Sequence, residues 1–196
     1  MINYKLFATL LLAATSMSLS ATERDTICID KGWMFHRGDI SEVSQLKSAM
    51  QAQGEAVNLP HDFQISQDWV APDASERPDN SDAGSNVRSR LSPRGFKEMG
   101  IGWYRYELTP KEEWKGKRIV LDFQGIMLVG DVYLNGQRIG GTDYGYLGMD
   151  ADISKLLKYG QVNEIAVKAD TRNPNNSRWY TGAGLYRDVN LIITDS

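Results

Sequence analysis

The chain has 196 residues, of which 41% are hydrophobic and 24% are charged, a balance typical of a globular protein and sufficient for one domain with its own core. Lys and Arg number 22 against 25 Asp and Glu, which gives a net charge of -3 and excludes the electrostatic attraction that nucleic acids or anionic lipids require. One cysteine excludes an intrachain disulfide, and with only two histidines no zinc-ligand spacing appears, so we predict no metal site and no cofactor.

The first segment has the layout of a signal peptide. Met1 to Lys5 carries one positive charge, Leu6 to Ala14 is an unbroken run of apolar and small residues, and small residues follow. The apolar run is about half the roughly 20 residues that cross a bilayer as a helix, so we predict no membrane span. We expect residues 1–20 to be removed on export to the periplasm or the outside of the cell, which leaves one domain over 21–196.

Most of the remaining chain alternates between short strands and turns. Apolar, β-branched and aromatic residues occupy alternate positions, as in strands that bury one face, over Trp103 to Leu108, Arg118 to Phe123, Asp131 to Leu134, Gln137 to Ile139, Glu164 to Ala169 and Val189 to Ile193. Asn135 and Gly136 suit a two-residue hairpin turn. Helical spacing is confined to Ser41 to Gln53 and to Asp152 to Lys158, which begins with a capping Asp. This pattern predicts an all-β sandwich or barrel with one or two short helical segments.

Two further features are open to more than one interpretation. Pro72 to Gly95 is rich in Asp, Ser, Asn, Arg, Pro and Gly, and a loop of this length either serves binding or is a solvated insertion. Cys28 has no neighbouring His or Lys, so we expect a buried, unreactive thiol.

The carboxylates do not form a recognisable catalytic site. Glycoside hydrolysis requires two carboxyl groups across the scissile bond, and the dipeptide Asn163-Glu164 could suggest one of them. Because Ile165 begins an apolar alternation directly after it, we interpret this pair as a turn Asn and the exposed first residue of a strand. Asp150 and Asp152 could bind calcium, but helix capping by Asp152 explains the segment better.

Aromatic residues beside glycine and arginine are the most informative chemical feature. Gly100 to Arg105 and Ser177 to Arg187 each combine Trp, Tyr and Arg with glycines. A sugar site needs an aromatic plate for the apolar ring face and polar side chains for the hydroxyls, which makes Trp103 and Trp179 candidates. Packing in the core is the alternative for each of them, and the stronger one for Trp103.

Five ordered segments together resemble the N-terminal sugar-binding domain of glycoside hydrolase family 2, which includes β-galactosidases, β-glucuronidases and β-mannosidases. They are Asn58 to Phe63, Gly100 to Arg105, Asp131 to Gly136 with Ile139-Gly140, Tyr144 to Tyr146 with Asp152-Ile153, and Ser177 to Arg187. The resemblance implies a jelly-roll β-sandwich of the galactose-binding type. Leu59-Pro60-His61-Asp62 follows a strand, so we expect His61 and Asp62 to tie down a turn through side-chain to backbone hydrogen bonds, a structural role.

In that family the catalytic glutamates lie in a TIM barrel, which requires about 200 residues or more of its own. We therefore expect no catalytic residue in this chain, which resembles part of a glycoside hydrolase. The resemblance places Arg178, flanked by Asn176, where some members use an acid to hold the terminal sugar. Arg178, Trp179, Asn176 and Trp103 are the candidate substrate-binding residues, and Arg178 could equally pair with a carboxylate of the barrel.

These observations predict a non-catalytic carbohydrate-binding domain of an exported β-glycosidase, most similar to the β-galactosidase type, that acts in carbohydrate metabolism. Its expected partners are a β-linked saccharide and a TIM-barrel catalytic domain outside this chain. A free-standing lectin-like module is one alternative. A structural docking domain with an exposed apolar patch is the other.

Overall fold

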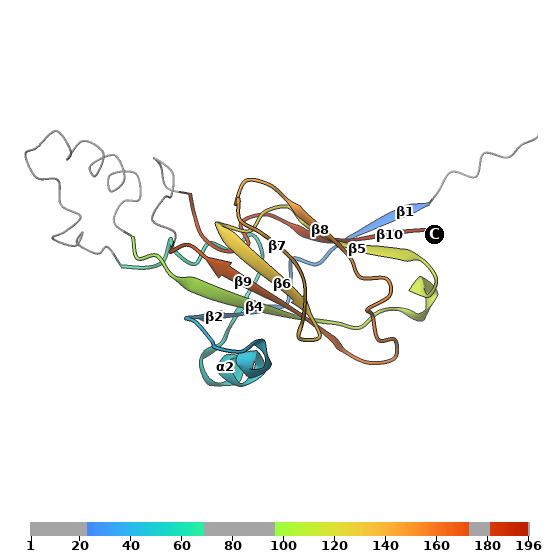
Figure 1. Ribbon diagram of the computed structural model, residues 1–196, viewed down its shortest axis with the longest axis horizontal. Helices are drawn as coiled ribbons and strands as arrows, with labels where there is room; N and C mark the ends of the chain where they lie inside the picture. The colour runs from blue at the N-terminus through green and yellow to red at the C-terminus, as the bar shows by residue number, and fades with distance from the viewer. Residues whose placement is uncertain (1–22, 69–96, 173–180, 196) are drawn as a thin grey trace, which may run out of the picture.

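A computed structural model describes residues 23–68, 97–172 and 181–195. These residues form two antiparallel sheets that face each other (Figure 1). In spatial order, the smaller sheet consists of β1 (Arg24–Cys28), β10 (Val189–Thr194), β5 (Arg118–Phe123) and β8 (Met149–Asp152). The larger sheet consists of β3 (Glu55–Val57), β2 (Trp33–Arg37), β4 (Ile101–Leu108), β9 (Asn163–Asp170), β6 (Val129–Leu134) and β7 (Gln137–Thr142). The predicted all-β sandwich is confirmed.

The main core lies between the two sheets and follows directly from the alternation in the sequence. Every second residue of β5 and of β9 points inward and is buried, and the larger aromatic side chains of β2 and β4 fill the space between them. The inward residues of these four strands are Ile119, Leu121, Phe123, Ile165, Val167, Ala169, Trp33, Phe35 and Tyr104. Burial of these side chains stabilises the sandwich by about 1.5–3 kcal/mol for each large residue.

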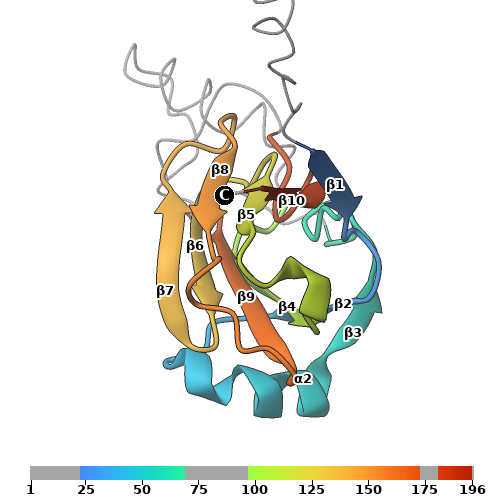
Figure 2. The same cartoon turned by 90° about the vertical axis from the view of Figure 1, so that its right-hand side faces the viewer.

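One helical segment covers the outer face of the larger sheet. The 3-10 turn η1 (Val43–Gln45) leads into α2 (Leu46–Gln53), so the helix predicted over Ser41 to Gln53 is confirmed. Leu46 and Met50 lie four residues apart on one face of α2 and pack on Ile101, Trp103 and Ala166. Figure 2 shows α2 on the outer side of β4 and β9. The outer face of the sheet thus carries a second, small core.

The predicted strands all appear, most of them extended by one to three residues. Asn135 and Gly136, at φ values of 52° and 82°, form the tight turn between β6 and β7. Four strands were not predicted: β1, β2, β3 and β8. These strands are short or, like β1, mostly exposed, so they lack a run of alternating apolar residues.

The one or two helical turns predicted over Asp152 to Lys158 are reduced to a single turn, in which the carbonyl of Ile153 accepts from the amides of Leu156 and Leu157 at 2.9 and 3.2 Å. Asp152 ends β8, and the residues after it form hydrogen-bonded turns. The Asp152 carboxylate accepts hydrogen bonds from the backbone and the hydroxyl of Ser154 at 3.0 and 2.5 Å, and the Ser154 hydroxyl bonds lower the pKa of Asp152. Asp152 therefore caps this turn through local hydrogen bonds to Ser154.

Cys28 is exposed at the end of β1, which corrects the expected burial. A hydrogen bond with Asp30 raises the pKa of its thiol above 9.0, so the thiol stays protonated near neutral pH. As for membranes, no helix in the described ranges has both the length and the apolar character needed to span one.

Candidate functional site

Five loops meet at one end of the sandwich, which we call the loop end. In the described residues they are 59–68, 97–100, 124–128, 143–148 and 171–187, the last with a gap at 173–180. In Figure 1 they surround the end at which β4 begins and β9 finishes. Four of the five segments that carry the family resemblance reach this end. We therefore take the loop end as the candidate site.

Asp62 joins two of these loops. Its Oδ1 accepts hydrogen bonds from the backbone amide of Gln64 at 2.9 Å and from that of Ala183, far along the chain, at 3.0 Å. A carboxylate that accepts two backbone N–H groups is held firmly, because charge-assisted hydrogen bonds are stronger than neutral ones. The predicted structural role of Asp62 is confirmed by these contacts.

His61 and Tyr104 form a buried polar contact beneath the same loops. The Tyr104 hydroxyl lies 2.8 Å from Nδ1 of His61, and the His61 amide donates to the carbonyl of Leu185 at 2.7 Å. Burial raises the pKa of Tyr104, so its hydroxyl keeps its proton at physiological pH. Burial also lowers the pKa of His61 below 6.5, against the opposing charges of Glu55 and Asp62, and this favours a neutral imidazole.

The pKa of His61 predicts a loss of stability in mild acid. Below pH 6.5 the unfolded chain binds a proton at His61 while the folded chain resists it, so the free energy of unfolding should fall as the pH drops below the unfolded value. Urea unfolding between about pH 7 and about pH 5.5 measures this slope. The variant His61→Asn should show a shallower slope than the parent chain, and equal slopes would contradict the prediction.

The loop before β4 is anchored to the 59–68 loop. The Gln64 side chain donates to the carbonyl of Lys97 at 3.2 Å, and the Lys97 ammonium donates to the carbonyls of Ile65 and Gln67. Arg37 donates to the carbonyl of Met99 at 3.3 Å. These contacts hold the chain in place where it returns at Lys97. The predicted loop Pro72 to Gly95 lies outside the described residues.

The other interrupted loop is anchored at Thr171. Its amide donates to the carbonyl of Gly100 at 2.9 Å, and its hydroxyl accepts from the amide of Gly100 at 3.0 Å. Arg172 then pairs with Asp170 through two hydrogen bonds of 3.0 and 2.8 Å. The candidates Asn176, Arg178 and Trp179 follow and lie outside the described residues, whereas the flanking residues on both sides, Arg172 and Thr181, belong to the loop end.

The remaining loop presents aromatic and aliphatic side chains to solvent. The hydroxyl of Tyr186 donates to the carbonyl of Gly145 at 2.8 Å and so fixes the loop from Asp143 to Gly148. In this loop Tyr144 is 55% exposed and Leu147 is 62% exposed. Tyr144 also contacts Tyr146, with ring centroids 5.6 Å apart. Sequence analysis missed this exposed set, although the Tyr-Gly-Tyr pattern between two glycine-bounded strands was a usable signal.

Trp103 does not lie at the loop end. It is the third residue of β4 and lies under α2, is 2% exposed and belongs to the small outer core. An indole in this position offers no ring face to a sugar at the loop end. We therefore remove Trp103 from that site; packing, the alternative interpretation, explains its position.

The dipeptide Asn163-Glu164 is structural, but not in the expected way. Asn163 is fully buried, whereas we expected a turn residue. Glu164 is partly buried and pairs with Arg105 at 2.5 Å. Asn163 is bound by polar groups from two other segments, Lys158–Gln161 and Asn135. Neither side chain reaches the loop end.

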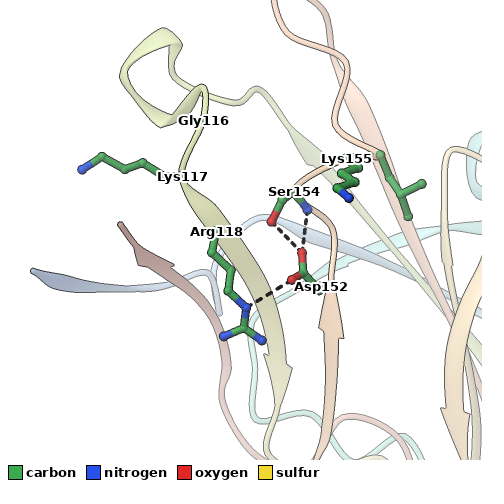
Figure 3. Close-up of a pocket in the computed structure, with 7 residues that line it drawn as sticks. Gly116, Lys117, Arg118, Asp152, Ser154 and Lys155 are labelled. Carbon is green, nitrogen blue, oxygen red and sulfur yellow. Dashed lines mark hydrogen bonds and ion pairs between the residues drawn. The ribbon is translucent and has the colours of Figure 1, made fainter. Parts of the chain in front are cut away.

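Polar groups also gather around a hollow of about 690 Å³ at the opposite end of the sandwich. Figure 3 shows Arg118 and Ser154 turned toward Asp152, and Lys117 turned away from it. Arg118 Nε lies 3.2 Å from the Asp152 carboxylate. Because these groups satisfy one another and do not point to a common centre, we assign them to the turn after β8.

Comparison with known proteins decides the family. Residues 101–182 match the family model described as the glycosyl hydrolase 2 galactose-binding domain-like family. The chain is an N-terminal domain of glycoside hydrolase family 2. It is 31% identical over 183 residues to the β-galactosidase BoGH2A of Bacteroides ovatus and 32% identical over 193 residues to a β-glucuronidase of Bacteroides fragilis. A crystal structure of a β-glycosidase from Bacteroides vulgatus superposes with a TM-score of 0.71 at 33% identity.

The family 2 domain spans about a fifth of these relatives. The match covers 93% of this chain but 20% of BoGH2A, and 95% of this chain but 23% of the B. fragilis enzyme. The superposition with the B. vulgatus structure includes 86% of this chain and 20% of that structure. The catalytic domain of those β-glycosidases is therefore absent from this chain. About four fifths of the length of each relative has no counterpart in this chain.

Proposed function

We propose that this family 2 domain completes the sugar pocket of an exported β-glycosidase of the β-galactosidase type, with its loop end facing the catalytic barrel. The observation that carries the proposal is the set of hydrogen bonds that join the loops of the loop end to one another. Asp62, Thr171 and Lys97 each join segments that are distant in sequence. These hydrogen bonds fix the residues on both sides of the segment that contains Asn176, Arg178 and Trp179.

Rigid flanks matter because a binding loop loses less conformational entropy when its ends are already fixed. In this proposal Trp179 contacts the apolar face of the terminal sugar, while Arg178 and Asn176 bind its hydroxyls or a carboxylate of the barrel. The relatives named β-galactosidase and β-glucuronidase support a β-linked glycoside as the substrate. The reaction itself would be carried out by the barrel.

The test replaces the corresponding domain of B. ovatus BoGH2A with this chain and measures hydrolysis of a chromogenic β-galactoside. We expect Trp179→Ala to raise KM about tenfold with kcat changed less than about threefold, because uniform substrate binding is lost. Tyr159→Ala is the control, since Tyr159 is a half-buried aromatic residue beside Lys115. An unchanged KM in a variant with a normal melting temperature would contradict the role of Trp179.

The isolated chain distinguishes this role from that of a free-standing lectin. With only one wall of the pocket present, we expect no turnover and galactose binding no tighter than about 1 mM. Galactose binding tighter than about 100 μM that Trp179→Ala abolishes would instead indicate a lectin.

A docking role for the loop end has a specific observation in its favour. Ile65, Tyr144, Tyr146 and Leu147 are large, exposed and located in loop-end segments, and exposed apolar groups of this kind mark interaction surfaces. This role is compatible with the proposed pocket, because the barrel that receives the sugar would also cover these side chains.

Export is the remaining part of the proposal. It rests on the layout of residues 1–20, which lie outside the described residues. Mass spectrometry of the protein secreted by a bacterial host tests it: the mature chain should begin at Ala21 or Thr22, and an intact Met1 would contradict it.

A further inference from the structure

Two adjacent hollows form a groove on the outer face of β6 and β7 that reaches the loop end at Asp143. It consists of two hollows of about 360 and 270 Å³ that share Asp131 and Arg138. The first hollow reaches Tyr133, Lys168 and the segment before α2, and the second reaches Thr142. Figure 2 shows β6 and β7 side by side at the edge of the larger sheet, with α2 below them. We call this feature the β6–β7 groove.

A β-bulge aligns the side chains of this groove. The pairing of β6 with β7 shifts between Val132 and Tyr133, so that Val132 pairs with Gly140 and Tyr133 pairs with Arg138. The extra residue, Ile139, packs against the main core. Paired residues share a face of a sheet, so the shift places Arg138 beside Tyr133 on the outer face. Bulges commonly re-aim a side chain in this way.

Both cations of the groove are paired with carboxylates, and Glu42 and Asp143 add two more carboxylates to its lining. Arg138 Nε donates to Asp131 Oδ1 at 2.7 Å, and Lys168 Nζ donates to Asp39 Oδ1 at 3.0 Å. The Arg138 side chain is nevertheless 58% exposed, so most of its donors face solvent. Adjacent donors and acceptors match hydroxyl groups, which both donate and accept hydrogen bonds. A carboxylate or phosphate ligand would need an unpaired cation.

Two aromatic rings form the apolar part of the first hollow. Trp103 and Tyr133 both line it, with ring centroids 5.9 Å apart and planes inclined by 32°. Tyr133 is partly exposed. The indole N–H of Trp103 is buried, and it has no hydrogen-bond partner in the part of the chain that the structure describes. Because Trp103 lines the hollow, its indole N–H signal can report on a ligand that enters it.

We propose that the β6–β7 groove binds a neutral oligosaccharide. One sugar unit packs on Tyr133 in the first hollow, and the next units follow the strands past Arg138 and Asp131 toward Thr142. An aromatic ring beside paired charges suits a sugar, which has an apolar C–H face and hydroxyls at its edge. The first hollow contains no loop-end residue, so the groove would hold a polymeric substrate near the enzyme independently of the catalytic reaction.

The test titrates the purified chain with β-1,4-galactotetraose and follows the indole N–H signals by NMR, the Trp103 signal being assigned with Trp103→Phe. We expect Kd in the range of about 0.1–5 mM and a shift of the Trp103 signal. Arg138→Ala should raise Kd at least about fivefold. The matched control is Arg118→Ala, since Arg118 is also 58% exposed and also pairs with an Asp on a neighbouring strand.

Tyr133→Ala should raise Kd by at least about fivefold as well, while Tyr159→Ala should leave it within about twofold. Melting temperatures of all variants establish that they are folded. The proposal is overturned if the tetrasaccharide causes no shift of Trp103 at about 20 mM, or if Arg138→Ala and Arg118→Ala behave alike. If the chain binds tetragalacturonate but not the neutral tetrasaccharide, the proposal that the ligand is neutral is wrong. Trp179→Ala should leave this binding unchanged, which separates the groove from the loop-end pocket.

Discussion

Replacing Gly184 with Ala should lower the free energy of unfolding by about 3–4 kcal/mol. Gly184 has a φ of +92°, and a Cβ added there would lie 2.1 Å from the Tyr104 hydroxyl and 3.0 Å from the carbonyl oxygen of His61. The residue also exchanges two backbone hydrogen bonds with Met127, of 2.9 and 3.1 Å. The chain therefore cannot move aside without breaking the bridge between two loops of the candidate site.

Two variants separate the steric effect from the backbone effect. Gly160 has a φ of +74° with open space around its missing Cβ, so Gly160→Ala carries backbone strain alone and should cost about 1 kcal/mol. Adding Tyr104→Phe to Gly184→Ala removes the nearest atom, and the double variant should be at least about 1 kcal/mol more stable than the sum of the single effects predicts. Strict additivity in urea unfolding would refute the clash.

Replacing Asn163 with Leu is the second change with a large expected effect, about 3 kcal/mol. The Asn163 amide donates to the carbonyls of Lys158 and Gln161 at 2.8 and 3.2 Å. Its oxygen accepts from the Lys158 amide and from the Asn135 side chain, both at 2.9 Å. Leucine has a similar volume but removes all four of these partly buried hydrogen bonds, and each lost partner carries a cost.

Asn190→Leu is the matched control, because Asn190 is also buried but makes one side-chain hydrogen bond, of 3.3 Å, to Asp122. It should cost at most about 1 kcal/mol. Equal losses for the two variants, measured by thermal and urea unfolding, would show that the Asn163 network contributes little. A large loss at Asn163 alone supports a structural role for Asn163-Glu164 and argues against a catalytic one.

Strands with a long alternating pattern were predictable, and short strands were not. In β5 and β9 successive side chains face core and solvent, so the residue order itself carries the signal. By contrast, β1 is mostly exposed and is fixed by its pairing with β10, from Arg24 opposite Thr194 to Cys28 opposite Asn190. Such a strand depends on a partner that is distant in the chain. Local spacing cannot predict it.

The contacts of the candidate site were also predictable only where they are local in the sequence. Asp62 was predicted to tie down a turn, because an Asp beside a Pro-containing turn accepts local backbone hydrogen bonds, and its contact with Gln64 confirms this. Its second contact, with Ala183, spans most of the chain and could not be predicted. The same holds for Tyr104, which sequence analysis placed on a strand without noting that its hydroxyl meets His61.

The sequence by itself determined the class of the fold, the family and the hairpin between β6 and β7, because strand alternation, ordered motifs and turn residues are local properties of the chain. Tertiary structure decided which aromatic residues are exposed. It buried Trp103 beneath α2 and left Tyr144 in solvent, although both stand near glycines in the sequence. The physical reason is that burial depends on which segments pack together, and that choice is made by the sum of contacts across the whole domain.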